Sequence, residues 1–280
     1  MPAAQQKSEL QKKRRARRQK LSAIFDALDR FGSRLSAADL KELGIRHEKE
    51  MSLDGNDGPK FFSAYCDVLN KPAPGVLDNY ISFDPKHGGK PYYNAQALAS
   101  YFTYYSARCD CPNEDISPAG ICYADYGDHN FGALMDLTFG RRWGVKATWH
   151  MPDREAPHMV VAMFSEMAEG IEDALFHGEV KTTIRVMHGR LKKASLRSNL
   201  FAPVLIFSAI GEHHLRVIEA YHDGKELVMR TTKLFDLGQR DDDLLVTLSK
   251  WHLGGASAKS TKSPESDSLD IGVAETRTIS

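Results

Sequence analysis

Apolar residues near the start of the chain recur at the spacing of a helix. Five of them lie three or four positions apart, and these are Leu21, Ile24, Leu28, Phe31 and Leu35. Such a stripe is typical of a helix that packs one face against the rest of a protein. An amphipathic helix is therefore predicted over residues 8–30. Ser36 and Asp39 then have the spacing of a capping box, which predicts a short second helix ending at Gly44.

Further stretches of the chain also show helical spacing. Four more helices are predicted, and these span 61–70, begin at Asn94, span 157–177 and begin at the Asp241–Asp243 cap. The stripe of residues 157–177 is the clearest of the four, because apolar side chains recur there over about four helical turns while the acidic residues fall mostly elsewhere. The final helix is expected to end at the Gly254–Gly255 pair.

Strand patterns concentrate in the last third of the chain. Three consecutive antiparallel strands are predicted over residues 203–210, 214–224 and 225–235, because apolar and β-branched residues dominate them. Asp223–Gly224 supplies a hairpin turn between the second and the third. The segment GEVKTTIRVM, residues 178–187, is interpreted as a further strand.

Together these elements predict an α+β fold. The body should be mainly helical with a late antiparallel β-meander, preceded by a basic N-terminal helix. Three regions are expected: a basic helical arm over 1–52, a globular domain over 59–254 and a disordered tail over 255–280. The turn-rich sequence LDGNDGPK, residues 53–60, separates the first two, and the tail has too few apolar residues to form a core.

Charge is distributed unevenly along the chain. The whole sequence has 37 basic and 37 acidic residues, but residues 1–20 hold eight of the bases and one acid, so the remainder carries a net charge of −7. A basic segment on an acidic body is typical of proteins that meet nucleic acid, an import receptor or an anionic surface. No apolar run approaches the roughly 20 residues of a membrane span, so a membrane partner is not expected.

The basic segment is the main candidate site. Seven of the nine residues in KKRRARRQK are positively charged, and these are Lys12, Lys13, Arg14, Arg15, Arg17, Arg18 and Lys20. Side chains of this type bind the phosphate backbone by releasing counterions, and import receptors read similar clusters. A solvated tail is the third interpretation of the run.

The same region resembles a basic leucine-zipper region. Leu21, Leu28 and Leu35 lie seven residues apart, and Arg18 lies ten residues before Leu28. The resemblance implies DNA binding and a homodimer formed through these leucines. However, Leu10 occupies the position of that family's base-reading asparagine, so phosphate contact is expected rather than base recognition.

Two alternative sites contain chemically active residues. A zinc ion could be bound by three thiolates and an imidazole, and these belong to Cys109, Cys111, Cys122 and His129. Their spacing matches no common zinc motif. A metal-dependent nuclease or hydrolase would use Asp153, Glu179 and Lys181, because PD followed by ExK resembles the PD-(D/E)xK arrangement of two metal-binding carboxylates and a lysine.

Two further clusters are of interest. His213 and His214 are expected in a turn between strands, with His222 at the end of the next strand, and nearby imidazoles can bind a metal ion or respond to pH. The segment RVMHGRLKKASLR, residues 185–197, is a second basic patch that would extend a phosphate-binding surface of the arm.

The stretch HHLRVIEAYHDGKELVMRTTKLFDL is similar to a group of uncharacterised filamentous-fungal proteins, and that resemblance implies no activity. The leading hypothesis is a nuclear, non-enzymatic regulatory protein that contacts nucleic acid through its basic arm and needs no cofactor. The alternatives are the nuclease or hydrolase, and an interaction protein, in the nucleus or the cytoplasm, whose arm is only a localisation signal.

Overall fold

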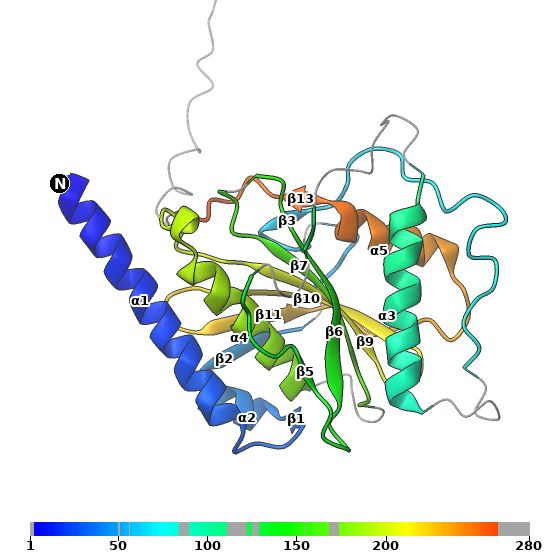
Figure 1. Ribbon diagram of the computed structural model, residues 1–280, viewed down its shortest axis with the longest axis horizontal. Helices are drawn as coiled ribbons and strands as arrows, with labels where there is room; N and C mark the ends of the chain where they lie inside the picture. Colours follow the sequence, from blue (N-terminus) through cyan, green and yellow to red (C-terminus); the bar gives the residue numbers. More distant parts are fainter. Residues whose placement is uncertain are drawn as a thin grey trace, which may run out of the picture.

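A large mixed β-sheet forms the centre of the molecule, as the computed structural model in Figure 1 shows. The structure describes residues 3–49, 51–55, 57–83, 90–110, 122–124, 129–153, 155–167 and 174–262. Nine strands of this part of the chain form the sheet, in the order β2-β11-β10-β9-β7-β6-β4, with β5 beside β6 and β12 beside β10. The β7–β9 and β2–β11 pairs are parallel and the other pairs in this sheet are antiparallel.

The strands of the central sheet vary widely in length. The long ones are β6 (Trp143–His150), β7 (Met159–Ser165), β9 (Val204–Ile210), β10 (His214–His222) and β11 (Leu227–Thr231). The short ones are β2 (Ile45–Glu48), β4 (Cys122–Ala124), β5 (Met135–Asp136) and β12 (Phe235–Asp236). Two small sheets pair β1 (Arg34–Leu35) with β8 (Leu175–Phe176), and β3 (Phe62–Ser63) with β13 (Gly255–Ala256).

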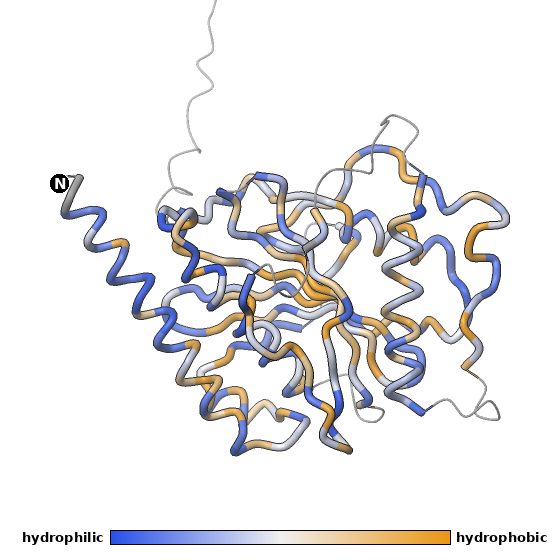
Figure 2. The backbone as a smooth tube through the Cα atoms, in the orientation of Figure 1, coloured by the Kyte–Doolittle hydropathy of each residue, from blue (hydrophilic) through white to orange (hydrophobic). Residues whose placement is uncertain are grey.

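Helices cover both faces of the central sheet. The described helices are α1 (Ala3–Leu28), α2 (Ala37–Glu42), α3 (Pro91–Arg108), α4 (His177–Lys192) and α5 (Asp242–Leu253), with a 3₁₀ turn at Ala194–Leu196. One hydrophobic core joins α1, α2 and α4 to one face, and a second joins α3 and α5 to the other. Successive residues of a strand point to opposite faces, so the central strands contribute alternately to the two cores. Figure 2 shows hydrophobic positions concentrated along these strands, while the N-terminal half of α1 is largely hydrophilic.

The predicted mainly helical body with a late β-meander is therefore wrong. The three late strands exist as β9, β10 and β11, but they form the middle of a mixed sheet that also includes strands from the first half of the chain. A β-hairpin, β6–β7, precedes α4, and α4 then connects β7 to the parallel strand β9. Parallel neighbours require such a crossover, and the helices on both faces bury the strands completely.

Two neighbouring segments have the opposite secondary structure to the predicted one. The predicted helix over 157–177 contains β7, and the predicted strand over 178–187 lies in α4. Every residue of β7 is buried, and a strand that is apolar on both faces matches a helical stripe by chance. In α4 the β-branched residues favoured a strand, but Val180, Ile184, Met187 and Leu191 recur at helical spacing and enter the core.

Several local predictions are confirmed. Ser36 and Asp39 form the capping box of α2, and Gly44 follows that helix with a positive φ of 69°. Helix α3 is present, although it begins at Pro91 rather than Asn94, and Asp241 caps α5 through the N–H of Leu244. The helix predicted over 61–70 is absent: this described segment contains the short strand β3.

The predicted arm and the described part of the predicted tail, residues 255–262, pack against the body. Helix α1 belongs to the same core as α4, and β2 pairs with β11, so residues 3–49 fold together with the globular part of the chain. At the other end, β13 pairs with β3 and the carbonyl of Thr261 accepts hydrogen bonds from Leu200 and Phe201. The rest of the predicted disordered tail, residues 263–280, lies outside the described residues. Within the described ranges, none of the helices combines the length and the apolar character needed to cross a bilayer.

Candidate anion-binding groove between α1 and α4

Helices α1 and α4 enclose a groove lined by basic side chains. It consists of two adjoining cavities of about 410 Å³ and 340 Å³, which share Ser22, Asp26 and His188. Helix α1 contributes Arg15 and Arg18, and the groove's other basic residues, Arg185 and Lys192, come from α4. The structure thus joins the two basic segments of the sequence, residues 12–20 and 185–197, in one place. We call this feature the α1–α4 groove.

The electrostatics of the groove favour an anion. Asp26 is the only acidic residue among its described lining residues. Burial lowers the pKa of His188, and the nearby cations Lys192 and Arg18 lower it further, so this imidazole adds no charge at neutral pH. The Nε atoms of Arg18 and Arg185 are shielded from solvent and have no hydrogen-bond acceptor among the described residues. An anion in the groove would supply acceptors for these donors.

Arg14 has a structural role although it belongs to the same basic run. Its side chain is 5% exposed, and its guanidinium donates hydrogen bonds to the carbonyl oxygens of Leu191, Leu196 and Asn199. These carbonyls lie at and just after the end of α4, where helices lack internal donors and carry a partial negative charge. Burial, together with the neighbouring arginines, lowers the pKa of Arg14 to about 10, which leaves it charged at neutral pH. Arg14 is therefore a buried C-terminal cap of α4.

Two further cations of the run attach α1 to the turn between β10 and β11. Arg17 is also 5% exposed, donates to the carbonyl of Asp223 at 3.2 Å and lies over the ring of Phe201 at 4.9 Å. Lys20 donates through Nζ to the carbonyls of Gly224 and Lys225, at 2.9 and 3.1 Å. Of the seven predicted nucleic-acid contacts, these two and Arg14 bind the body of the protein. The remaining four face outward or line the α1–α4 groove, and they are Lys12, Lys13, Arg15 and Arg18.

A signal for this division is present in the sequence but was missed. The stripe that contains Leu21, Ile24 and Leu28 continues backward at the same spacing through Arg17, Arg14 and Leu10. Leu10 packs against the core cluster that contains Phe201. The position expected for a base-reading asparagine is thus part of the packing face of α1.

Substituting Arg14 is expected to affect stability, whereas substituting its neighbour Arg15 is not. Arg14→Gln removes charged hydrogen bonds from three buried carbonyls and should lower the free energy of unfolding by about 2–4 kcal/mol. Arg15→Gln removes the same charge from an exposed position, so its cost should stay within about 0.5 kcal/mol. Urea denaturation followed by circular dichroism measures both values. Equal costs for the two variants would contradict the structural role of Arg14.

The three leucines proposed for a homodimer are not available for one. Leu21, Leu28 and Leu35 are each 0% exposed and belong to the core between α1, α4 and the sheet. A coiled-coil dimer needs these side chains on the helix surface, where they can insert between those of a partner helix. The seven-residue spacing therefore reflects packing within one chain, and the leucine-mediated homodimer is not supported.

The residues of the nuclease alternative have different surroundings. Glu179 is 0% exposed, and Arg216 on β10 donates to both of its carboxylate oxygens, with an Nε–Oε1 distance of 2.9 Å. Lys181 instead pairs through Nζ with Asp29 of the loop after α1, at 2.7 Å. Asp153 lies in an exposed turn after β6 and accepts a hydrogen bond from the N–H of Glu155. The Glu179 carboxylate is thus already engaged by a buried arginine.

The cysteine alternative is described only in part. Cys109 directly follows the last residue of α3, and Cys122 begins β4. His129 stacks on Phe131 at 5.1 Å. Cys111 lies outside the described residues, so a zinc site formed by these four residues stays a prediction.

Fold and groove define a three-layer α/β/α protein with a cationic groove on one helical layer. Comparison with known family models, with curated proteins and with solved structures finds no match for this chain.

Proposed function

We propose that this chain binds the phosphate backbone of nucleic acid through the α1–α4 groove and the exposed face of α1, as a non-enzymatic regulatory protein of the nucleus. The observation that carries the proposal is the convergence of two basic segments, 12–20 and 185–197, on one surface of an otherwise acidic protein. Clustered cations of this kind release counterions from a nucleic-acid backbone when they bind it.

The dimensions of α1 suit a helical backbone. The rise of 1.5 Å per residue places Lys7 roughly 16 Å from Arg18 along the helix, which matches about five phosphates of one DNA strand at 3.4 Å each. Figure 1 shows the N-terminal half of α1 extending beyond the edge of the sheet, so its outer face is accessible. Lys12, Lys13 and Arg15 lie on this exposed surface.

Nucleic acid is favoured over an import receptor because the basic run is not continuous on the surface. Arg14 and Arg17 are buried against the body, and a receptor that reads an uninterrupted basic peptide would have to detach both of them. A phosphate backbone needs only the outward cations and the groove. Contacts to phosphate carry no sequence information, so binding should depend little on nucleotide sequence.

The proposal predicts strongly salt-dependent binding. With about five phosphates neutralised, the affinity for a 20-base-pair duplex should fall on the order of 10²- to 10³-fold between 50 and 200 mM salt. The double variant Arg15→Gln/Lys192→Gln removes one cation from each helix and should reduce the slope of log affinity against log salt by about 2. Fluorescence anisotropy with labelled DNA and RNA duplexes of unrelated sequence measures the slope.

A matched control removes two exposed lysines elsewhere. Lys146 and Lys233 lie on β6 and in the loop after β11, outside the α1–α4 groove, and Lys146→Gln/Lys233→Gln changes the net charge by the same amount. This control should retain wild-type affinity. Equal losses in both double variants would show that net charge alone is responsible, and binding to an import receptor without binding to either duplex would overturn the proposal.

A further inference from the structure

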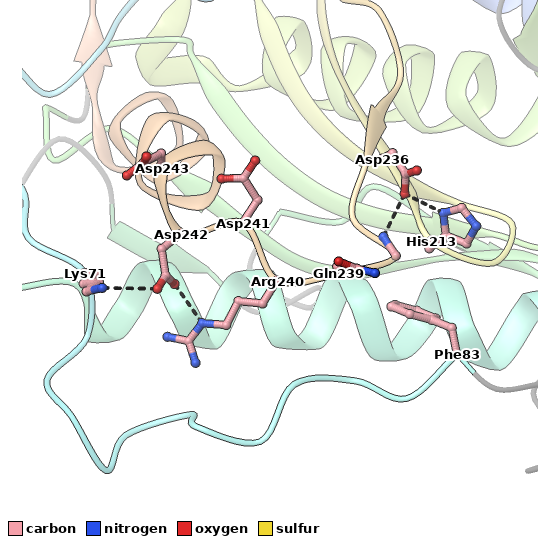
Figure 3. Close-up of a pocket in the computed structure, with 10 residues that line it drawn as sticks. Lys71, Phe83, His213, Asp236, Gln239, Arg240, Asp241, Asp242 and Asp243 are labelled. Atoms are coloured by element: carbon pink, nitrogen blue, oxygen red, sulfur yellow. Dashed lines mark hydrogen bonds and ion pairs between the residues drawn. The ribbon is translucent and has the colours of Figure 1, made fainter.

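A second cluster of chemically active side chains lies on the opposite helical layer, next to α3 and α5. Each of three residues, His213, His214 and Asp236, offers one potential ligand atom, and these three atoms lie within 4.8 Å of one another. They line or adjoin a cavity of about 900 Å³ (Figure 3). The cluster is separate from the α1–α4 groove and plays no part in the proposed nucleic-acid contact.

The fold positions the three residues at one end of the sheet. His213 belongs to the tight turn between β9 and β10, and His214 is the first residue of β10. Asp236 on β12 is the register partner of His214, so their side chains share a face of the antiparallel pair. The N–H of Leu237 donates to the carbonyl of His213 at 2.8 Å, which ties the turn to β12. The three residues are therefore fixed by backbone pairing.

The ligand atoms are close to the arrangement that a metal ion requires. The Nδ1 atom of His213 lies 2.9 Å from Oδ1 of Asp236, and the imidazole rings of His213 and His214 have centroids 4.4 Å apart. Ligands of a tetrahedral zinc ion with bonds near 2.0–2.1 Å are separated by about 3.4 Å. The three ligand atoms lie within 4.8 Å of one another. Asp236 is 71% exposed and His213 is 29% exposed, so both side chains have room to rotate and bring these atoms to the separation of zinc ligands.

The surroundings stabilise a carboxylate and attract a cation. The N–H of Gly238 donates to Oδ1 of Asp236 at 2.8 Å, and this bond, with the adjacent imidazoles, lowers the pKa of Asp236. Phe83 packs against His213 with ring centroids 5.9 Å apart. Hydrogen bonds to a ligating carboxylate and an apolar neighbour are the usual supports of a metal ligand set.

The wall of the cavity adds negative charge. It contains four aspartates, Asp236 and Asp241 to Asp243, against two cations, Lys71 and Arg240. Both cations pair with Asp242, at 3.4 Å from Lys71 and 2.8 Å from Arg240, as Figure 3 shows, and the four aspartates exceed the two cations by two charges. The local field therefore favours a divalent cation beside His213.

From this geometry we infer that His213, His214 and Asp236 form a binding site for a divalent transition-metal ion such as Zn²⁺. Two imidazoles and one carboxylate select zinc, nickel, cobalt or copper over magnesium and calcium, which prefer oxygen ligands. Three protein ligands leave a coordination position open toward the cavity. His222 is not part of this site: it ends β10, roughly 26 Å from His214 at the rise of a strand, and accepts a hydrogen bond from the N–H of Gly224.

The test is calorimetric titration of Zn²⁺ into the full-length chain without an affinity tag. We expect one saturable site per chain that millimolar Mg²⁺ does not displace. His213→Ala and Asp236→Asn should each weaken binding at least tenfold. Asp236→Asn retains an oxygen that accepts from Gly238, so its loss of affinity is not a folding effect. Circular dichroism spectra and melting temperatures equal to those of the wild type confirm the fold of each variant.

Two control variants make the outcome decisive. Glu212→Gln changes the exposed residue next to His213 and should leave the affinity unchanged. Cys109→Ser/Cys122→Ser should also bind Zn²⁺ normally. Absence of a saturable site in the wild type, equal weakening in Glu212→Gln, or loss of binding in the cysteine variant but not in His213→Ala would each overturn the assignment.

Discussion

Replacing Arg216 by methionine is expected to lower the free energy of unfolding by about 3–5 kcal/mol, because it leaves the buried carboxylate of Glu179 without its partner. Arg216 is 1% exposed and Glu179 is 0% exposed, so water cannot compensate for the loss. The guanidinium also donates to the carbonyl of Ala174 at 2.9 Å and lies 5.1 Å from the ring of Phe176. Urea denaturation gives the change, which is a large part of the roughly 5–15 kcal/mol that stabilises an ordinary domain.

A double-mutant cycle separates the ion pair from general damage to the core. Glu179→Gln keeps an oxygen that accepts from the N–H of Phe176 but leaves Arg216 as an unpaired buried cation, so it should be similarly destabilising alone. In the double variant neither charge remains, and its cost should be well below the sum of the two single costs. Additive costs would contradict a specific pair.

Arg46 provides a matched comparison on the same sheet. It lies on β2 with three acidic partners, Glu48, Asp223 and Glu226, but its side chain is 45% exposed. Exposed ion pairs contribute about 0–1 kcal/mol, so Arg46→Met should cost no more than that. The contrast tests burial as the cause, since both arginines belong to strands and both pair with carboxylates.

The sequence of β10 shows how much of this arrangement can be predicted. Its alternation correctly separates Arg216 from Glu219 onto opposite faces of the sheet, because side chains of a strand alternate. It does not show that both faces are covered by helices. The partner of Arg216 is Glu179, 37 residues upstream in a segment that was interpreted as a strand, and the partner of Glu219 is Arg230 on β11, at 3.1 Å. The burial of two charged side chains on a central strand is explained by these two partners.

The candidate site was predictable in part for a similar reason. The sequence identifies both basic segments, but it does not show that α1 packs against α4 or that Arg14 is buried. Charged side chains are rarely buried without partners, and a basic run therefore favours an exposed interpretation. The partners of Arg14 are backbone carbonyls beyond residue 190, and backbone acceptors leave no trace in the sequence. For the metal-ligand cluster, the histidine pair was visible, whereas Asp236 depended on the pairing of β12 with β10.

Mild acid is expected to destabilise the folded chain strongly between pH 6.5 and 4.5. Burial lowers the pKa of His158 and of His222 to about 4 and that of His252 to about 3. A histidine in the unfolded chain titrates near pH 6.5, so below this pH the unfolded state binds protons that the folded state does not bind. The stability from these neutral imidazoles is fully present above pH 6.5 and is lost as the pH falls toward 4.

The expected effect is large because three groups act in the same direction. Each buried neutral histidine contributes a slope of about 1.4 kcal/mol per pH unit once its unfolded form is protonated, so the three together give about 4 kcal/mol per unit. Carboxylates affect the stability at lower pH. A hydrogen bond from Lys181 lowers the pKa of Asp29, and the contribution of Asp29 to stability is lost only below about pH 4. Urea denaturation at half-unit steps from pH 7 to 4.5 measures the slope.

His252 is the best position for a variant that tests this explanation. Its ring is 2% exposed and lies against Phe102, Trp149 and Phe207, with centroids 4.4–5.4 Å apart. Leucine is apolar and of similar size, so His252→Leu should retain most of the stability at pH 7 while removing one titrating group. The slope should fall by about a third in that variant. An unchanged slope, or a wild-type stability that stays constant between pH 6.5 and 4.5, would show that buried histidines do not control the acid sensitivity of this fold.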